Sequence, residues 1–125
     1  MIHVLIIEDE PAIARVLSLL ITKNYPDFQI SGICKNGRDG LQKILELKPE
    51  LVFTDITMPV MNGLDATKII REENKEIPII MQTAYAFSSD KENAMNAGAS
   101  EVLVKPITLS ILRGTLTKYF PELVW

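Results

Sequence analysis

The sequence has few of the residues on which redox, disulfide and histidine chemistry depend. It contains one cysteine and one histidine among 125 residues. A single cysteine, Cys34, cannot form an internal disulfide, and its apolar neighbours predict a small buried side chain. His3 lies at the start of the first apolar run, and we expect it to be an ordinary strand-edge residue rather than a catalytic base.

Long apolar runs and a basic excess are also missing. No apolar run reaches the roughly 18 residues that a membrane span requires, and Met1 to Val4 lack the basic start of a secretory signal. We therefore expect a cytoplasmic location and no membrane partner. The net charge of −3 predicts no direct nucleic-acid binding through general attraction to phosphates.

The remaining composition is that of an ordinary globular protein. Hydrophobic residues make up 47% and charged residues 23% of the chain, which argues against disorder. A chain of 125 residues suffices for one domain that buries about two thirds of its unfolded surface. We find no repeat, linker or low-complexity segment, and expect a single domain over residues 1–125 with no effector region.

One acidic residue stands at the end of a short apolar run. Leu51 to Phe53 suit a strand buried on both faces, and Asp55 follows directly. Pro59 prevents continuation of the strand, and Asn62-Gly63 indicates a turn. Taken alone, Asp55 is equally well explained as a turn-forming residue.

Strand and helix patterns alternate along the whole chain. We expect strands at 3–7, 29–34, 51–55, 78–83 and 101–104, and helices at 11–24, 64–73 and 89–97. A further helix should follow Asn36-Gly37 and stop at Pro49, and a last helix should lie between Thr108 and Pro121. Helical spacing predicts these inward-facing residues: Ile13, Val16, Leu17, Leu20, Ile21, Leu41, Ile44, Leu45, Ile69, Ile70, Ile111, Leu112, Thr115, Leu116 and Tyr119, with Leu47 as a further candidate. Ser89 and Glu92 have the spacing of a capping box, and Thr108 is expected to cap the last helix.

This alternation predicts an α/β fold with a five-stranded parallel sheet, doubly wound by helices on both faces. Five strands favour the order 2-1-3-4-5, in which strands one and three are neighbours. Ligands bind such sheets at the carboxyl ends of the strands. There the predicted order gathers Glu8, Asp9, Asp55, Thr83 and Lys105.

Clustered carboxylates repel one another unless a cation lies among them. The ligands here are hard oxygens, which predicts Mg²⁺ (or Mn²⁺) rather than zinc. A carboxylate beside such an ion can attack phosphorus to form an aspartyl phosphate, with Lys105 and Thr83 holding phosphoryl oxygens. Each residue also has a plain alternative. Asp9 could cap a helix, Lys105 could extend to solvent, and Thr83 could be an ordinary strand residue.

These motifs together resemble the receiver domain of two-component response regulators over essentially the whole chain. The residues that carry the resemblance are Glu8-Asp9, Asp55 within D-I-T-M-P-V-M-N-G, Thr83-Ala84 and Lys105-Pro106. The resemblance implies the flavodoxin-like receiver fold, with Asp55 as the phosphoacceptor.

The resemblance also implies the roles of the surrounding residues. Asp9, Asp55 and the Thr57 backbone carbonyl would bind the metal directly, whereas Glu8 would act through water. Lys105 would pair with Asp55 or its phosphate, and the Lys105-Pro106 bond would be cis. Thr57 and Tyr85 would control the approach of water to the acyl phosphate.

Four positions depart from the commonest family pattern. Glu8 replaces a frequent Asp, Asn62 a usual Asp, and Ile107 a usual Phe. Val102 stands where relatives commonly carry an aromatic ring that moves with the switch residues Thr83, Ala84 and Pro106. Since Val has no ring, we expect switching through the loop 84–88, which includes Tyr85, and the following helix.

The resemblance implies a signalling protein of a phosphorelay. Its partner would be a sensor histidine kinase or a histidine phosphotransfer protein, and a homodimer through the fourth helix, fifth strand and fifth helix is possible in this family. It would be no enzyme beyond its own phosphorylation and dephosphorylation. A stand-alone regulator, a truncated regulator and a piece of a hybrid kinase stay open.

Two rival functions come from other classes. A flavodoxin-like binding protein for a phosphate-bearing cofactor would need a Gly, Ser and Thr-rich loop after the first strand, where this chain has Glu8-Asp9-Glu10-Pro11. A Mg²⁺-dependent phosphatase would need a second acid two residues after the nucleophile, where this chain has Thr57.

Overall fold

The computed structural model describes residues 1–56, 61–84 and 88–123, and five strands alternate with five helices in these ranges. The predicted alternation is confirmed. In chain order the elements are β1 (Ile2–Ile7), α1 (Pro11–Asn24), β2 (Phe28–Cys34), α2 (Gly37–Leu47), β3 (Leu51–Asp55), α3 (Gly63–Glu73), β4 (Ile79–Thr83), α4 (Ser88–Ala97), β5 (Glu101–Val104) and α5 (Leu109–Tyr119). Thr57 and Tyr85 lie outside the described residues.

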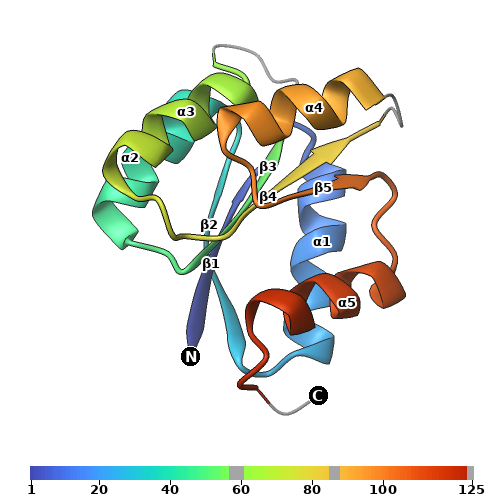
Figure 1. Cartoon of the computed structure of the whole chain (residues 1–125). Coiled ribbons are helices and arrows are strands. Elements are labelled where there is room, and N and C mark those ends of the chain that lie inside the picture. The colour runs from blue at the N-terminus through green and yellow to red at the C-terminus, as the bar shows by residue number, and fades with distance from the viewer. Residues whose placement is uncertain (57–60, 85–87, 124–125) are drawn as a thin grey trace.

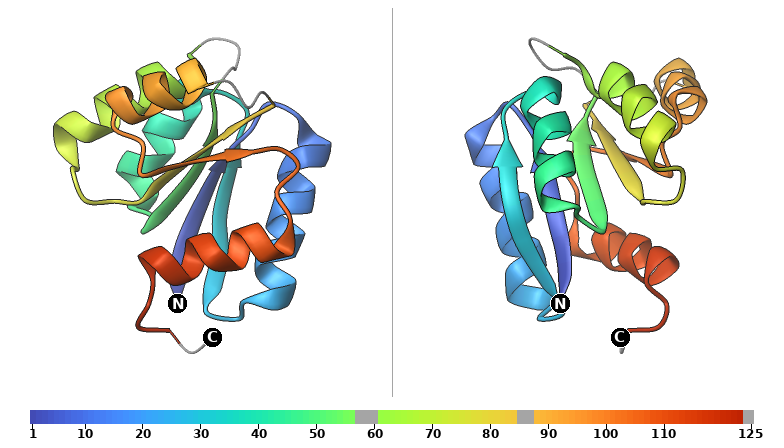
Figure 2. Two further views of the ribbon diagram at one scale, coloured as in Figure 1. Left: turned by 45° about the vertical axis from the view of Figure 1, so that its right-hand side comes forward. Right: turned by 90° about the vertical axis from the view of Figure 1, so that its left-hand side faces the viewer.

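The strands form one parallel sheet in the order β2-β1-β3-β4-β5, as predicted. Helices cover both faces of this sheet. α1 and α5 pack on one face, and α2, α3 and α4 pack on the other (Figures 1 and 2). The chain leaves β1 and β3 toward opposite faces, which opens the site between the carboxyl ends of these two strands.

The central strands are apolar because both of their faces are buried. In β1, Val4 and Ile6 belong to the cluster beneath α1 and α5, whereas Leu5 and Ile7 belong to the cluster beneath α2 and α3. All four side chains are fully buried. At about 25 cal/mol per Å² of apolar surface, such burial is the main stabilising contribution to the fold.

The helices bury narrower faces than the apolar pattern predicted. In α1 the buried residues are Ala14, Leu17 and Ile21, whereas Val16 is 58% exposed. Four other residues that were expected to face inward are exposed as well, because each lies at the edge of the buried stripe of its helix or beyond it: Leu45, Leu47, Ile69 and Ile111. Tertiary packing, rather than the amount of apolar surface on a helix, decides which row faces the sheet.

Side-chain caps fix three of the helix starts. Asn36 Oδ1 accepts a hydrogen bond from the Asp39 amide, and Asn62 does the same for Asp65 at the start of α3. Thr108 caps α5 as predicted, by accepting from the Ile111 amide. α4 begins at Ser88, so the expected cap residue Ser89 lies inside its first turn.

Within residues 1–56, 61–84 and 88–123, no helix combines the length and apolar character that a membrane span needs.

Candidate functional site

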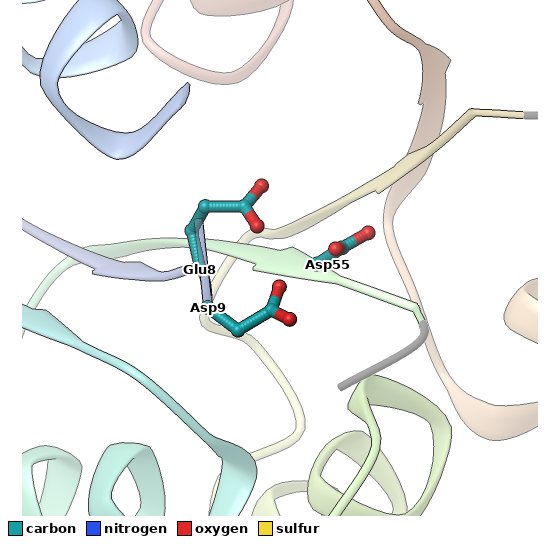
Figure 3. A group of neighbouring side chains, drawn as sticks. All are labelled: Glu8, Asp9 and Asp55. Atoms are coloured by element: carbon teal, nitrogen blue, oxygen red, sulfur yellow. The ribbon is translucent and has the colours of Figure 1, made fainter. Parts of the chain in front are cut away.

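Three carboxylates meet at the carboxyl ends of β1 and β3. Each of Glu8, Asp9 and Asp55 offers one oxygen, and these oxygens lie within 4.8 Å of one another. Figure 3 shows Glu8 and Asp9 leaving the end of β1 beside the end of β3, where Asp55 lies. Glu8 is 1% and Asp55 8% exposed, whereas Asp9 is partly exposed. The sheet therefore gathers negative charge in a place with little water to screen it.

Lys105 supplies positive charge to this cluster. Its Nζ lies 2.8 Å from Glu8 Oε1 and 3.2 Å from Asp55 Oδ2. Burial by itself would lower the pKa of Lys105, but the hydrogen bond to Glu8 and the charges of both acids outweigh burial, so the pKa is raised. Lys105 thus stays a cation and joins the ends of β1 and β3 to the segment after β5.

The pKa of Glu8 is raised to about 7. Burial is the main cause, and the negative charge of Asp55 and the hydrogen bond with Asp9 raise it further. The hydrogen bonds from Lys105 and from the Glu10 backbone act in the opposite direction. The Glu8 side chain is fully buried and already paired with Lys105, so protein groups rather than solvent surround its carboxylate.

The donor set fits a small divalent cation. Mg²⁺ binds oxygens at about 2.0–2.1 Å, so two ligands on opposite sides of one ion lie about 4 Å apart. The carboxylate oxygens, all within 4.8 Å, can reach that spacing through small side-chain rotations. No capping bond competes for Asp9, because the N-cap residue of α1 is Glu10, which makes no side-chain cap.

Thr83 and Lys105 lie together at the next two strand ends. Thr83 is 6% exposed at the end of β4, and its carbonyl accepts a hydrogen bond of 2.8 Å from the Lys105 amide. Ala84 follows as an exposed residue, and the Lys105-Pro106 bond is cis, as expected from the resemblance. Four strand ends thus contribute to one site.

The glycine at the start of α3, Gly63, lies against the end of β3. A Cβ atom on Gly63 would lie 2.1 Å from the Asp55 carbonyl oxygen, a distance that no side chain tolerates. The Gly63 amide donates to the Ile56 carbonyl at 2.9 Å. The Asn62-Gly63 pair therefore does more than make the predicted turn, because it fixes the backbone beside Asp55.

Val102 packs on the side of the sheet that α4 covers. It is partly buried against the cluster of Ile56, Met81, Ala94 and Ala99. The members of this cluster from α4 and the turn after it are alanines, so the contact between α4 and the sheet contains few large side chains.

Two features of the site escaped the sequence reasoning. The ion pair between Glu8 and Lys105 spans 97 positions and had no local signal. Gln82 is 1% exposed. Its amide side chain directly follows the apolar run Ile79–Met81, and this break in the apolar pattern was a signal that could have been noticed. Its Nε2 has no hydrogen-bond partner among the described residues.

Comparison with known families settles what kind of domain this is. Residues 4–117 match the family described as the response regulator receiver domain. The chain belongs to this family. As a receiver it has the phosphoacceptor role in two-component signalling, and the rival reading as a cofactor-binding flavodoxin-like protein is not favoured.

Relatives of this receiver differ in how much of their own length lies outside the matched domain. The chain is 37% identical over 116 residues to the chemotaxis protein CheY of Thermotoga maritima, covering 93% of this chain and 95% of that protein. It is 36% identical over 119 residues to a probable C4-dicarboxylate response regulator, DctR, of Halalkalibacterium halodurans. That match covers 95% of this chain and 51% of the relative, so this chain spans about half of the relative's length.

A solved structure supports the same assignment. The complex of CheX and CheY with BeF₃ and magnesium from Borrelia burgdorferi contains a chain similar to this receiver, with a TM-score of 0.88 and 25% identity. The match covers 95% of this receiver and 89% of that chain.

Proposed function

We propose that this receiver takes a phosphoryl group onto Asp55 from a phosphohistidine of a sensor histidine kinase or a histidine phosphotransfer protein. The observation that carries the proposal is the ion pair of 3.2 Å between Asp55 and Lys105 beside two further carboxylates. A buried acid with a cation against it and a metal-binding oxygen cluster around it is suited to act as a nucleophile toward phosphorus.

In this reaction one carboxylate oxygen of Asp55 forms a bond to phosphorus as the bond from phosphorus to the donor's imidazole nitrogen breaks. The imidazole leaves with the electron pair of that bond and takes up a proton. Lys105 is placed to hold a phosphoryl oxygen, because its Nζ already contacts Asp55 and Glu8. The Thr83 hydroxyl would approach a second phosphoryl oxygen from the end of β4.

Asp9 and Asp55 would bind Mg²⁺ or Mn²⁺ directly, together with the Thr57 carbonyl, and Glu8 would act through water. When bound, the ion would offset the negative charge that gathers as the phosphoryl group approaches three carboxylates. The direct role of Asp9 is supported by its partial exposure, and the outer role of Glu8 by its existing ion pair with Lys105.

The assignment of Asp55 is tested by phosphorylation with acetyl phosphate and Mg²⁺, followed by intact mass measurement. The wild-type chain should gain one phosphoryl group, and Asp55→Asn should gain none. Asp65→Asn is a matched control, because Asp65 is an exposed acid in the first turn of α3. Phosphorylation of Asp55→Asn at the wild-type rate would show that another residue accepts the group.

The output of this receiver would be a movement of the segment between Thr83 and Gly98. Val102 has no aromatic ring that could move between two positions, and its short, branched side chain has few rotamers. The alanine-rich contact of α4 offers little resistance to displacement. Phosphorylation would therefore bias an existing equilibrium of the loop after β4 and of α4.

Amide hydrogen exchange with and without beryllofluoride tests this switch. The largest changes should fall between Thr83 and Gly98, with small changes in β5. Changes confined to β5 and α5 would contradict the proposed coupling.

In the same loop, Tyr85→Ala should shorten the phosphoryl lifetime if the ring shields the acyl phosphate from water, and an unchanged or longer lifetime would argue against that role.

A homodimer would form through the face of α4, β5 and α5, where Met95 and Val104 are exposed apolar side chains. The domain would catalyse only its own phosphorylation and dephosphorylation, bind no nucleic acid directly and work in the cytoplasm. Sedimentation with and without beryllofluoride tests the dimer.

A further inference from the structure

The start of α2 meets the segment before α3 close to the end of the phosphoacceptor strand. The two helices lie side by side on one face of the sheet (Figure 1). Gly37, the first residue of α2, contacts Met61, and its amide donates a hydrogen bond of 2.9 Å to the Met61 carbonyl. The start of one helix thus holds the backbone that leads into the next.

The contact is so close that only glycine permits it. A Cβ atom on Gly37 would lie 2.5 Å from the Met61 carbonyl oxygen and 3.0 Å from Met61 Cγ. Gly37 is buried, and among the glycines of the described residues it is Gly98, not Gly37, that has a positive φ. The missing side chain, rather than backbone freedom, therefore explains the glycine at position 37.

The segment held by Gly37 leads directly to the phosphoacceptor. Met61 is followed by Asn62, whose side chain caps α3, and by Gly63, whose amide donates to the Ile56 carbonyl at 2.9 Å. A Cβ on Gly63 would meet the Asp55 carbonyl oxygen at 2.1 Å, so the backbones of these two residues are in contact. A displacement of Met61 would therefore reach the backbone of Asp55 through two residues.

We propose that Gly37 is a positioning residue of the metal site, because its contact with Met61 fixes residues 61–63 against Asp55. This role rests on the proposed binding of Mg²⁺ by Asp55 and by the Thr57 carbonyl, which lies between Ile56 and Met61 in the sequence. Mg²⁺ requires oxygens at about 2.0–2.1 Å in near-ideal octahedral geometry, so it tolerates little displacement of a ligand. Groups that orient ligands from behind accordingly matter for metal affinity.

Gly37→Ala tests this role. The added methyl group would push the Met61 carbonyl away by up to about 0.9 Å, the difference between 2.5 Å and the 3.4 Å at which ordinary contacts begin. The dissociation constant for Mg²⁺ is measured on the unphosphorylated chain from backbone amide chemical shifts. It should rise about tenfold, as is typical when a group that supports a metal ligand is altered.

Ca²⁺ separates a shifted ligand from a general loss of structure. Ca²⁺ accepts longer bonds of about 2.3–2.6 Å in flexible geometry, so it should tolerate the displaced backbone better. The affinity of Gly37→Ala for Ca²⁺ should therefore fall by a smaller factor than its affinity for Mg²⁺. A merely destabilised chain would lose affinity for both ions alike.

Two other glycines provide matched controls. In Gly40→Ala, one turn further along α2, the new Cβ would meet the end of the Ile7 side chain at 2.4 Å, and that flexible end can move where a backbone carbonyl cannot. In Gly114→Ala, on α5, the new Cβ would have no atom within 4 Å. Both variants should keep the wild-type affinity for Mg²⁺.

The wild-type chain offers a second measurement that needs no substitution. If the bond between Gly37 and Met61 supports Mg²⁺ binding, bound Mg²⁺ must support that bond in return. Saturating Mg²⁺ should therefore slow hydrogen exchange at the Gly37 amide. The Lys48 amide, which donates to the Ile44 carbonyl at 3.0 Å at the other end of α2, should exchange at an unchanged rate.

Four results would overturn the role of Gly37 and leave that of Asp55 intact. They are wild-type Mg²⁺ affinity in Gly37→Ala, equal losses of Mg²⁺ and Ca²⁺ affinity, an equal loss of Mg²⁺ affinity in Gly40→Ala, and exchange at the Gly37 amide that does not respond to Mg²⁺. A wild-type chain that binds no Mg²⁺ would overturn the proposed metal site itself, and the role of Gly37 with it.

Discussion

Arg71 links three parts of the fold and provides a sharp test of how the far end of α4 is held. Its Nε donates to the Gly98 carbonyl at 2.7 Å, and Nη1 donates to the Ile77 carbonyl at 2.7 Å. Nη2 donates to Ser100 Oγ at 3.1 Å. Gly98 has a φ of 110°, and a Cβ there would lie 2.6 Å from Arg71 Cγ, so only glycine lets the arginine lie this close.

We expect Arg71→Met to lower the free energy of unfolding by about 3 kcal/mol. Hydrogen bonds from charged donors contribute about 1.5–3 kcal/mol each, and we take the lower end for the two short ones because the guanidinium is only partly buried. Burial lowers the pKa of Arg71, which agrees with a side chain removed from much of its water. The methionine keeps the apolar part of the side chain in place.

Urea denaturation measures this loss. For a slope of about 2 kcal/mol per molar urea, the midpoint should fall by about 1.5 M. Lys68→Met is the matched control, because Lys68 is an exposed cation on the same helix, and its midpoint should barely move. A midpoint for Arg71→Met close to that of the control would refute the reasoning.

A double-mutant cycle separates the individual bond to Ser100. Ser100→Ala removes the acceptor of Arg71 Nη2 and also the acceptor of the Ile79 amide, at 3.1 Å. The two substitutions together should cost less than the sum of the single costs, by about 0.5–1.5 kcal/mol. Strict additivity would show that Arg71 does not act through Ser100.

Two further predictions concern the metal site and the end of α5. Asp9→Ala should weaken Mg²⁺ binding in a calorimetric titration, whereas Glu10→Ala should have little effect because Glu10 is exposed and outside the carboxylate cluster; equal affinities in the two variants would count against Asp9 as a direct ligand. Burial, and then the hydrogen bond of 2.7 Å to Glu101, raises the pKa of Tyr119 to about 12, so folding favours the neutral phenol. The contribution of the Tyr119 phenol to the free energy of unfolding should therefore be fully present below about pH 10 and be lost as the pH rises toward 12. Urea denaturation of Tyr119→Phe should show a smaller alkaline fall than the wild-type chain, because the raised pKa of Lys105 also removes stability at high pH, and an identical fall in the variant would exclude Tyr119 as a source.

The sequence by itself determined the architecture and the position of the acids. Runs such as Val4–Ile7 are apolar at every position because both faces of a central strand are covered, and that pattern is local. Chirality and strand order then bring the ends of parallel strands to one edge. Asp9 and Asp55 could therefore be placed together before any coordinate was known.

Tertiary structure alone decided which apolar row of a helix faces the sheet and which charges pair. Val16 and Leu17 are neighbours of similar polarity in the sequence, yet one is 58% and the other 4% exposed. The rotation of α1 depends on side chains from distant strands, and so does the contact between Lys105 and Glu8. Such contacts are set by packing among segments far apart in the chain, and for that reason local sequence patterns do not encode them.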